Sequence, residues 1–256
     1  MNWNSVKENI VSWIRQYIAE SKSGGVVLGL SGGLDSAVTA ALSVEALGAD
    51  SVDMIALPYR VSDPSSLDDA RKISEHLGGK LEVFNISAPV DDMIKLMGGI
   101  DELQLGNITA RMRMIVLYNL SAKRCRLVAG TGNRTESYLG YSTLWGDMAC
   151  AFTPIGGLFK TQERKLAREL GLPEWIITKT PTADLWHGQT DEGELGITYE
   201  IADKILFAHI EKSVDRAELL QMGFSSDEID LVLDRIIKYN YKRRMPVFPS
   251  IKRLPL

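Results

Sequence analysis

The sequence has few of the residues that mark several common classes of protein. It contains two cysteines, Cys125 and Cys150, with no Cys-x-x-Cys pair, and three histidines among 256 residues. Two cysteines cannot form the disulfide framework of a small secreted domain, and their spacing gives no basis for a zinc site. We therefore expect a protein of the reducing cytoplasm.

Long apolar runs and an excess of positive charge are also missing. No stretch approaches the ~18 consecutive apolar residues of a membrane span, and the amphipathic pattern of residues 2–22 lacks the uninterrupted apolar centre of a signal peptide. The net charge of -4 gives no general attraction to nucleic acid. We expect neither a membrane nor a nucleic-acid partner, so an anionic ligand has to be bound by a local site.

Short apolar runs alternate with longer helical patterns over the first half of the chain. The runs are VVLGL (26–30), SVDMIALP (51–58), KLEVFNI (80–86) and RLVAGT (126–131), and helical patterns lie near 34–47, 66–77 and 107–124. This alternation predicts an α/β fold, a doubly wound parallel sheet with flanking helices that binds its ligands at the carboxyl ends of the strands.

Beyond residue 155 the strand pattern gives way to helical patterns. These lie near 161–170, 198–211, 214–222 and 226–240. The intervening segment KTPTADLWHGQTDEGELG (179–196) is rich in glycine, threonine and acidic residues. We expect one domain over 1–256, with a mobile lid near 180–197 and a helical C-terminal part.

The stretch SGGLDS (31–36) follows the first apolar run and begins the next helix. Two glycines let backbone amides approach an anion, and the helix N-terminus adds a partial positive charge. The stretch lacks the lysine of the GxxxxGK[ST] phosphate loop. It therefore suits a whole pyrophosphate held by amides and by the hydroxyls of Ser31 and Ser36.

Asp35 lies within this stretch and would oppose a polyphosphate. A carboxylate about 4 Å from a phosphate charge costs on the order of 4 kcal/mol at an effective dielectric of 20, more than the ~1 kcal/mol that a helix terminus returns. A divalent cation removes the conflict, because Mg2+ is commonly held by one or two carboxylates together with phosphate oxygens. The alternative is that Asp35 is only a favourable acid in the first helical turn.

The motif SGGLDSA after a strand resembles the signature of the PP-loop ATP pyrophosphatases, whose fold is adenine nucleotide alpha hydrolase-like and Rossmann-like. These enzymes cleave ATP between the α and β phosphates to adenylate a substrate. The resemblance implies ATP as a substrate and Mg2+ as the metal, and it leaves the second substrate open.

Four further motifs resemble the NAD synthetases in order and spacing: GNITARMRM (106–114), GTGNRTE (130–136), GDMACAFTPIGGLFKTQ (146–162) and PTADLWHGQTDEGELGITY (181–199). The resemblance implies ATP-dependent amidation of deamido-NAD to NAD with ammonia, through an adenylated carboxylate and with release of pyrophosphate and AMP. It also implies a homodimer, and apolar stripes on the N-terminal helix and the 107–120 helix are compatible with one.

The same resemblance assigns residues to the site. Asp35, Glu136 and Lys160 are implied as catalytic, with Asp35 and Glu136 as metal ligands. The residues implied in ATP binding are Ser31, Gly32, Gly33, Leu34, Asp35, Ser36, Ala37, Val38, Arg113, Thr131, Lys160 and Thr182. Asn107, Arg111, Asp147 and Lys242 are implied in deamido-NAD binding. From local spacing alone, Glu136, Arg111 and Arg113 fit solvated surface positions better than a site, whereas Lys160 near a helix start, where the dipole disfavours a cation, slightly favours a function.

Three positions depart from the family pattern. Leu144 stands where many ammonia-dependent members carry a lysine, Ala151 where they often have an aspartate, and Tyr241 in place of the histidine of a His-Lys pair. All three belong to the deamido-NAD half of the pattern, so its contacts are the least determined part of the prediction.

Neither cysteine lies in an arrangement typical of an amidase nucleophile, so we expect free ammonia as the nitrogen donor and leave open a glutaminase on a separate chain. Two alternatives remain. One is another adenylating PP-loop enzyme, similar to the synthetase half of GMP synthetase, and the other is a non-catalytic nucleotide-binding sensor.

Overall fold

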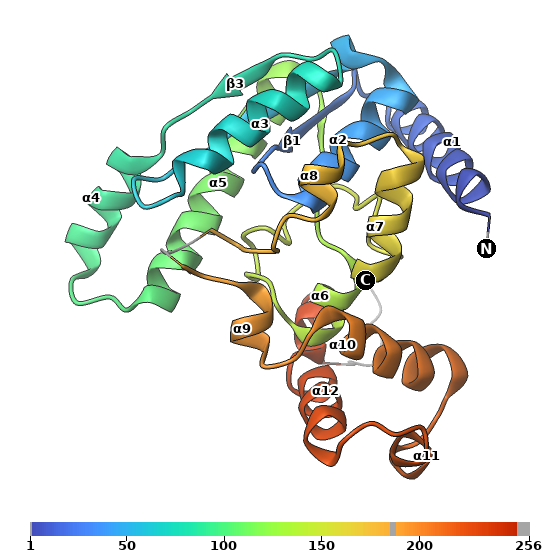
Figure 1. The fold of residues 1–256 in the computed structure, drawn as a ribbon. Coiled ribbons are helices and arrows are strands. Elements are labelled where there is room, and N and C mark those ends of the chain that lie inside the picture. Colours follow the sequence, from blue (N-terminus) through green and yellow to red (C-terminus); the bar gives the residue numbers. More distant parts are fainter. Residues whose placement is uncertain (1, 185–187, 250–256) are drawn as a thin grey trace, which may run out of the picture.

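A computed structural model describes residues 2–184 and 188–249. Its centre is a parallel four-stranded sheet in the order β3-β2-β1-β4 (Figure 1). The strands are β1 (Val26–Gly29), β2 (Val52–Ala56), β3 (Leu81–Val83) and β4 (Leu127–Val128). In register, Val26 lies opposite Val52 on one side and Leu127 on the other. The predicted doubly wound parallel sheet is confirmed.

The two faces of the sheet are covered by different helices, because successive side chains of a strand point to opposite faces. Val26 and Leu28 belong to one buried cluster, and Val27 between them belongs to another. Helices contributing to the first cluster are α1 (Trp3–Ser21), α2 (Leu34–Leu47), α3 (Pro64–His76), α7 (Lys160–Glu169) and α8 (Glu174–Ile177). The opposite face is covered by α4 (Ser87–Met97) and α5 (Glu102–Arg124).

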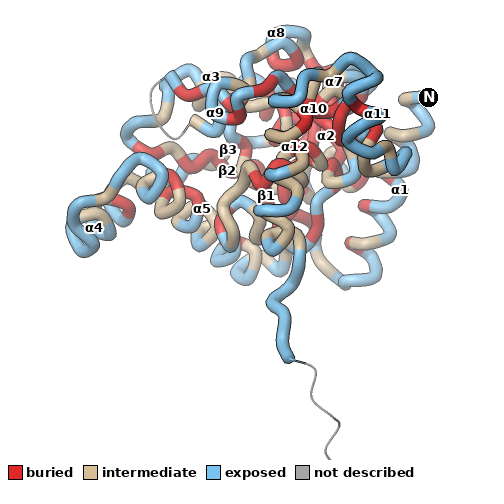
Figure 2. The backbone as a smooth tube through the Cα atoms, turned by 90° about the horizontal axis from the view of Figure 1, so that it is seen from below, coloured by how far each residue is buried: buried red, intermediate tan, exposed pale blue. Residues whose placement is uncertain are grey.

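A helical lobe with its own buried cluster follows the sheet (Figure 1). Its elements are α6 (Arg134–Leu139), α9 (Asp191–Leu195), α10 (Tyr199–Leu206), the π-helical turn η2 (Phe207–Glu211), α11 (Arg216–Gln221), α12 (Ser226–Lys238) and η3 (Asn240–Arg243). Figure 2 shows exposed backbone leaving this lobe toward the C-terminus, whereas the sheet and α2 are mostly buried. A short turn, η1 (Ala49–Ser51), precedes β2.

The predicted elements lie where the sequence pattern put them, with altered ends. Each strand is shorter than its apolar run, and the helix expected from residue 107 begins at Glu102, where Asp101 and Gln104 form a capping box. Helix α4 was not predicted. No helix within residues 2–184 and 188–249 has the length and apolar character needed to cross a membrane.

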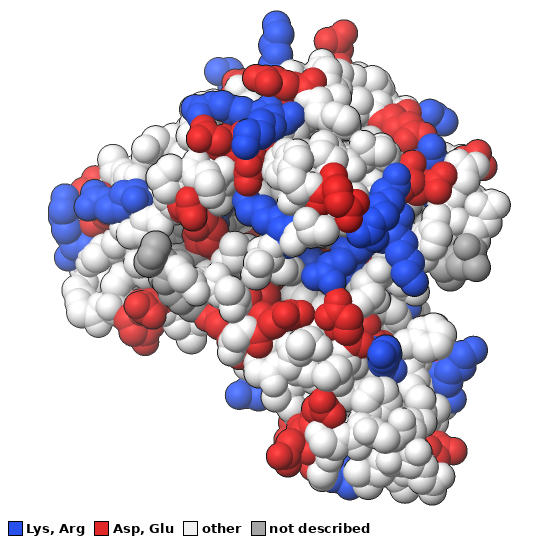
Figure 3. Space-filling view, viewed as in Figure 1, with Lys and Arg blue, Asp and Glu red and all other residues white. Residues whose placement is uncertain are grey.

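Charged side chains of both signs are interspersed over the face seen in Figure 3. This mixture matches the modest net charge of -4 that the sequence carries. A connected run of Lys and Arg side chains crosses the middle of this face, with acidic side chains beside it.

Candidate active site

A cavity of about 620 Å³ opens at the carboxyl edge of the sheet. Its lining comes from the ends of β1, β2 and β4, from α5, from the 140–147 loop and from the segment 179–194. A cavity of several hundred Å³ at this edge of a doubly wound sheet is the usual place for a ligand.

The SGGLDS stretch forms the turn between β1 and α2 at the floor of this cavity. Ser31 and Ser36 lie together in it, with Oγ atoms 3.1 Å apart, and the Ser36 hydroxyl donates to the Gly33 carbonyl oxygen. The Ser31 amide donates to Ser36 Oγ at 3.1 Å, and the Gly33 amide donates to Ser31 Oγ at 3.3 Å. These amides are the donors that an oxyanion would engage at a helix N-terminus.

Gly32 is the position in this turn where only glycine fits. Its φ is +79°, and a Cβ would lie 2.1 Å from the carbonyl oxygen of Ser66 on α3. A side chain is therefore blocked by backbone, and the left-handed conformation is itself unfavourable for other residues. The turn is packed directly against the first part of α3.

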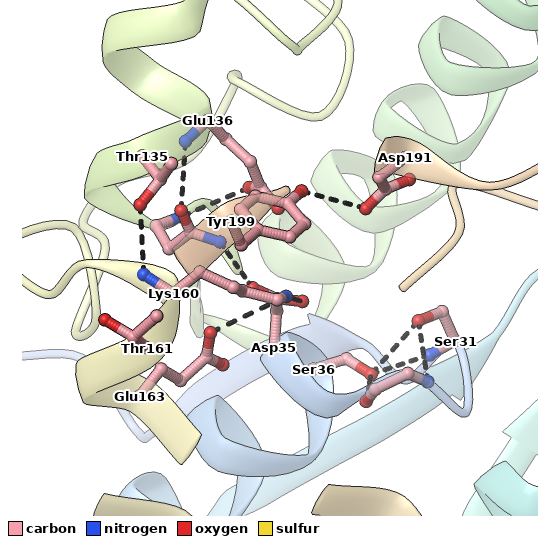
Figure 4. Close-up of polar contacts among 12 residues, drawn as sticks. Ser31, Asp35, Ser36, Thr135, Glu136, Lys160, Thr161, Glu163, Asp191 and Tyr199 are labelled. Atoms are coloured by element: carbon pink, nitrogen blue, oxygen red, sulfur yellow. Dashed lines mark hydrogen bonds and ion pairs between the residues drawn. The ribbon is translucent and has the colours of Figure 1, made fainter. Parts of the chain in front are cut away.

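Asp35 and Glu136, both labelled in Figure 4, are joined by Asn133 into a connected group beside the turn. The buried Asn133 side chain donates to Asp35 Oδ1 at 2.7 Å. The Asn133 amide donates to Glu136 Oε2 at 3.2 Å, and the Glu136 amide donates to Asn133 Oδ1 at 3.0 Å. Asn133 is thus both the N-cap of α6 and the link between the two carboxylates predicted to hold a metal.

Lys160 joins this group from the first turn of α7 and is fully buried. Its Nζ pairs with Asp35 Oδ2 and lies 3.7 Å from Oε2 of Glu163, one turn further along the helix. Glu163 is also 0% exposed, and within the described residues neither of its carboxylate oxygens has a hydrogen-bond partner. The site therefore contains a carboxylate that the sequence motifs did not indicate.

A second polar network holds the helix that carries Lys160. The Lys160 amide donates to Thr135 Oγ1 at 3.0 Å, and the Thr135 hydroxyl donates to the buried carboxylate of Asp203. Asp203 also accepts the Thr161 amide at 2.7 Å. These bonds tie α6, α7 and α10 together and satisfy amides at the start of α7 that have no partner inside the helix.

The charged groups in the site shift one another's pKa values. Burial raises the pKa of Asp35, but the charge of Lys160 and hydrogen bonds from the neighbouring side chains together outweigh burial, so the pKa lies below its usual value. Burial and then the neighbouring Asp35 charge raise the pKa of Glu136, and likewise that of Glu163, well above the usual range. Two carboxylates about 4 Å apart repel by on the order of 4 kcal/mol at an effective dielectric of 20, so this group is short of positive charge.

The residues fit a magnesium ion that is completed by phosphate oxygens. No group of three or more His, Cys, Asp or Glu side chains in residues 2–184 and 188–249 could hold a metal by itself. Mg2+ usually takes one or two carboxylates and substrate phosphates, however. Among the residues that the structure describes, Lys160 is the cation that pairs with both Asp35 and Glu163, and the raised pKa values of Glu136 and Glu163 reflect burial and the crowding of carboxylates around it.

The remaining residues assigned to ATP divide into two groups. Arg113, Thr131 and Thr182 line the cavity, and Arg113 Nε donates to the Leu57 carbonyl oxygen just after β2 at 3.1 Å. Ser31, Gly33, Leu34, Asp35, Ser36 and Lys160 also line it. Gly32 does not line the cavity, and Ala37 and Val38 are packed in the core.

The four residues assigned to deamido-NAD gather around the 140–147 loop. Asn107 Oδ1 accepts the Thr143 hydroxyl at 2.9 Å, and Asp147 Oδ1 accepts the Thr143 amide at 2.7 Å. Lys242 Nζ donates to the Gly140 carbonyl oxygen at 2.8 Å. Arg111 donates to the Leu144 carbonyl oxygen at 3.2 Å, but it is exposed and lies outside the cavity lining.

The three positions that depart from the family pattern are also separated. Tyr241 lines the cavity at η3, whereas Leu144 and Ala151 are not among the described lining residues. The cavity wall at this end is completed by Arg235 and Tyr239. The end expected to hold the dinucleotide therefore has aromatic and basic side chains from the helical lobe.

The segment expected to form a lid packs beside the site, and its residues 185–187 lie outside the described residues. Asp191, at the start of α9, is buried and accepts the Tyr199 hydroxyl at 3.0 Å. The ring of Tyr199 in turn lies 5.6 Å from Lys160 Nζ. At the other end of the segment, the Asp63 amide donates to Asp184 Oδ1 at 3.0 Å.

Several residues that shape the site were not predicted. Asn133 had a detectable signal, because Asn133 and Glu136 have the spacing of a capping box. Glu163 had the i,i+3 spacing to Lys160 as a signal, whereas Lys179 and Asp203 had none, because each acts through a residue that only the fold brings near. Lys179 Nζ, for example, lies 2.9 Å from the carbonyl oxygen of Gly32.

The fold and the site together define a class: a nucleotide-binding α/β enzyme with a phosphate-loop turn at the carboxyl edge of its sheet. Residues 6–246 match the NAD synthase family, and the chain belongs to that family. It is 45% identical over 98% of its length to an NH(3)-dependent NAD(+) synthetase of Chlorobium phaeobacteroides, of which it covers 91%.

Two solved structures are similar to this chain. In each comparison the matched region covers 98% of this chain and 100% of the solved chain. The NH3-dependent NAD synthetase from Campylobacter jejuni, in complex with the nitrate ion, is 34% identical with a TM-score of 0.84. The NMN synthetase from Francisella tularensis is 28% identical with a TM-score of 0.87.

Family membership confirms the predicted enzyme class, a carbon–nitrogen ligase, and the predicted reaction, ATP-dependent amidation of deamido-NAD with ammonia. Neither alternative, a GMP synthetase-like enzyme or a non-catalytic sensor, is supported by these comparisons.

Proposed function

We propose that this chain forms NAD with Asp35, Glu136 and Lys160 as its catalytic residues, by activating the carboxylate of deamido-NAD with ATP and amidating it with ammonia. The observation that carries this proposal is the convergence of these three side chains. They come from α2, α6 and α7 and meet beside the phosphate-loop turn, connected by Asn133 and the Lys160–Asp35 pair.

In this proposal the substrate carboxylate attacks the α-phosphorus of ATP, the α–β bond breaks, and pyrophosphate leaves. The amides and hydroxyls of the 31–36 turn bind the pyrophosphate, which supports its departure. Lys160 stabilises the charge that collects on the leaving oxygen. The chain provides no nucleophile of its own, so positioning carries much of the rate enhancement.

Asp35 and Glu136 are the residues that would hold Mg2+. When bound, the ion would neutralise charge on the phosphates. A bound cation also favours the ionised form of Glu136, whose pKa is raised by burial and by Asp35. The ion pairs of Lys160 with Asp35 and Glu163 support a site in which several carboxylates share one cation and a second positive charge is favourable.

The second half-reaction needs ammonia to displace AMP from the acyl adenylate before water does. We assign the exclusion of water to the segment 180–197, in which Thr182 and Asp191 line the cavity. Asn107, Asp147 and Lys242 are assigned to deamido-NAD because they line the cavity around the 140–147 loop, and Arg111 to its outer edge.

A second candidate substrate is nicotinate mononucleotide, which would give NMN. The similarity to the Francisella tularensis NMN synthetase favours it. The departure at Tyr241 favours it too, because Tyr241 lines the cavity at a position that the resemblance assigns to the larger dinucleotide. The shared carboxylate would be activated by the same residues in either case.

We further propose that the enzyme is a cytoplasmic homodimer. Helices α4 and α5 support an interface, because Leu96 on α4 and Ile115 on α5 are exposed at 78% and 53%. Large apolar side chains exposed to this extent are common where two protein chains meet.

The test is product formation by the purified chain with ATP and Mg2+, supplying deamido-NAD or nicotinate mononucleotide and either ammonium or glutamine. We expect NAD from deamido-NAD with ammonium alone and no stimulation by glutamine. A higher kcat/KM for nicotinate mononucleotide would replace the first substrate with the second. Absence of AMP and pyrophosphate with both carboxylates would contradict the assignment of the site.

A further inference from the structure

Lys179 connects three segments at the edge of the cavity. Its Nζ donates to the carbonyl oxygen of Gly32 at 2.9 Å and to Oδ2 of Asp69 on α3 at 2.8 Å. It precedes the segment assigned to the lid and is itself part of the cavity lining. The contact with Gly32 joins residues 147 positions apart in the chain.

The Gly32 carbonyl matters because it belongs to the peptide that carries the Gly33 amide. In a trans peptide the C=O and N–H groups point in opposite directions, so a carbonyl held by Lys179 fixes the direction of that amide. The Gly33 amide faces Ser31 Oγ at 3.3 Å, in the turn where the phosphates are expected.

A turn of two glycines does not by itself fix the direction of the Gly33 amide. Gly32 has φ of +79° and is followed by another glycine, and glycine populates both signs of φ at little cost. A flipped peptide would present a carbonyl oxygen to an anion. The packing of Gly32 against Ser66 limits the turn on one side, and the charged hydrogen bond from Lys179 holds it on the other.

We propose that Lys179 is a positioning residue for pyrophosphate recognition. It holds the Gly32–Gly33 peptide with its amide toward the phosphates, and Asp69 orients its ammonium group. This inference rests on the proposed function, because it concerns how the same site binds the pyrophosphate part of ATP. It also shows how a turn without the lysine of the GxxxxGK[ST] motif obtains a fixed cation next to it.

The test compares three variants by calorimetric titration with pyrophosphate, ATP and AMP, each with Mg2+. Lys179→Met removes the ammonium group and keeps the length of the side chain. Asp69→Asn keeps Lys179 but weakens its anchor. Lys72→Met is the matched control, since Lys72 also pairs with Asp69, at 3.2 Å, but is exposed and has no contact with the turn.

We expect Lys179→Met to raise the Kd for pyrophosphate and for ATP about tenfold and to leave the Kd for AMP within about twofold. Asp69→Asn should give a smaller change in the same direction, and Lys72→Met should match wild type. In kinetics, the KM for ATP should rise more than kcat falls.

An unchanged Kd for pyrophosphate in Lys179→Met, or an equal loss for AMP, would overturn the inference while leaving the proposed function in place. Wild-type protein that binds no pyrophosphate would instead overturn the site itself. Should Lys179→Met fail to fold, Lys179→Arg and Asp69→Asn still test the inference, because both keep a positive charge at position 179. Each is expected to weaken binding of pyrophosphate and ATP and to leave the Kd for AMP unchanged.

Discussion

At the scale of single residues, Asp35 interacts with two side chains and is also a proposed ligand of a cation. It pairs with Lys160 and accepts the Asn133 side chain, and it is also the carboxylate best placed for a cation beside the phosphate turn. An uncharged side chain of the same shape at position 35 loses the attraction to Lys160 and the attraction to the proposed cation.

Asp35→Asn should therefore lower kcat by about 100-fold or more, the size of effect seen when a group acting on transition-state charge is lost. The fold should persist, because the amide can still take part in hydrogen bonds within the turn. The measurement is steady-state NAD formation together with the far-UV circular dichroism spectrum. Asp50→Asn is the control, since Asp50 is exposed and precedes β2 at the opposite edge of the sheet. Wild-type turnover in Asp35→Asn would contradict the proposed metal role.

Whether a site residue could be predicted from the sequence depends on how far along the chain it lies from the residue it contacts. Asp35 belongs to a local pattern whose physical conflict with phosphate is visible without a structure. Lys179 and Asp203 belong to no such pattern, because their partners are 147 and 68 residues away. A side chain that positions a residue far away in the chain forms no recognisable sequence motif with it. The positioning residues could therefore be identified only from the structure.

At the scale of elements, the first turn of α7 is held in an unusual way. A lysine at a helix N-terminus is disfavoured by the helix dipole, yet Lys160 occupies that position and is fully buried. The nearby carboxylates of Asp35 and Glu163 offset this cost, and Asp203 accepts both the Thr135 hydroxyl and the Thr161 amide.

Asp203→Asn should destabilise the protein by about 1–3 kcal/mol, because an amide can accept through one oxygen only and a buried donor loses its partner. Urea unfolding with equal m-values gives the free energy of unfolding. Asp230→Asn is the matched control, because the Asp230–Arg216 pair is exposed and such pairs contribute about 0–1 kcal/mol. Equal stability of the two variants would show that the Asp203 network does not hold α7.

The elements themselves were largely predictable, and the exceptions have local causes. Helix α2 runs over Leu34–Leu47 as predicted from its apolar pattern, and the four strands lie within their apolar runs. Helix α4 was missed because Pro89 stands near its start; proline is tolerated in a first turn and ends a helix elsewhere, so the sequence alone allows either interpretation.

At the scale of the whole molecule, the sheet has helices on both faces, and the α4–α5 layer exposes large apolar side chains. α4 and α5 form the outer layer on the side away from α1 and α2 (Figure 1), and they expose Leu96, Leu103 and Ile115. A monomer would leave these side chains in water, and a second copy of the same face would bury them.

Ile115→Glu should therefore convert a dimer to a monomer in sedimentation equilibrium, because burying an unpaired carboxylate in an apolar contact costs more than the contact provides. Ile237→Glu is the matched control: Ile237 is exposed at 76%, compared with 53% for Ile115, but it lies on α12 in the helical lobe. The control should remain dimeric, and both variants should keep the wild-type circular dichroism spectrum. Since Asn107 and Arg111 lie on the same helix as Ile115, a monomeric variant should also bind deamido-NAD more weakly while retaining its Kd for ATP. A monomeric wild type, or an Ile115→Glu variant that stays dimeric, would place the interface elsewhere or remove it.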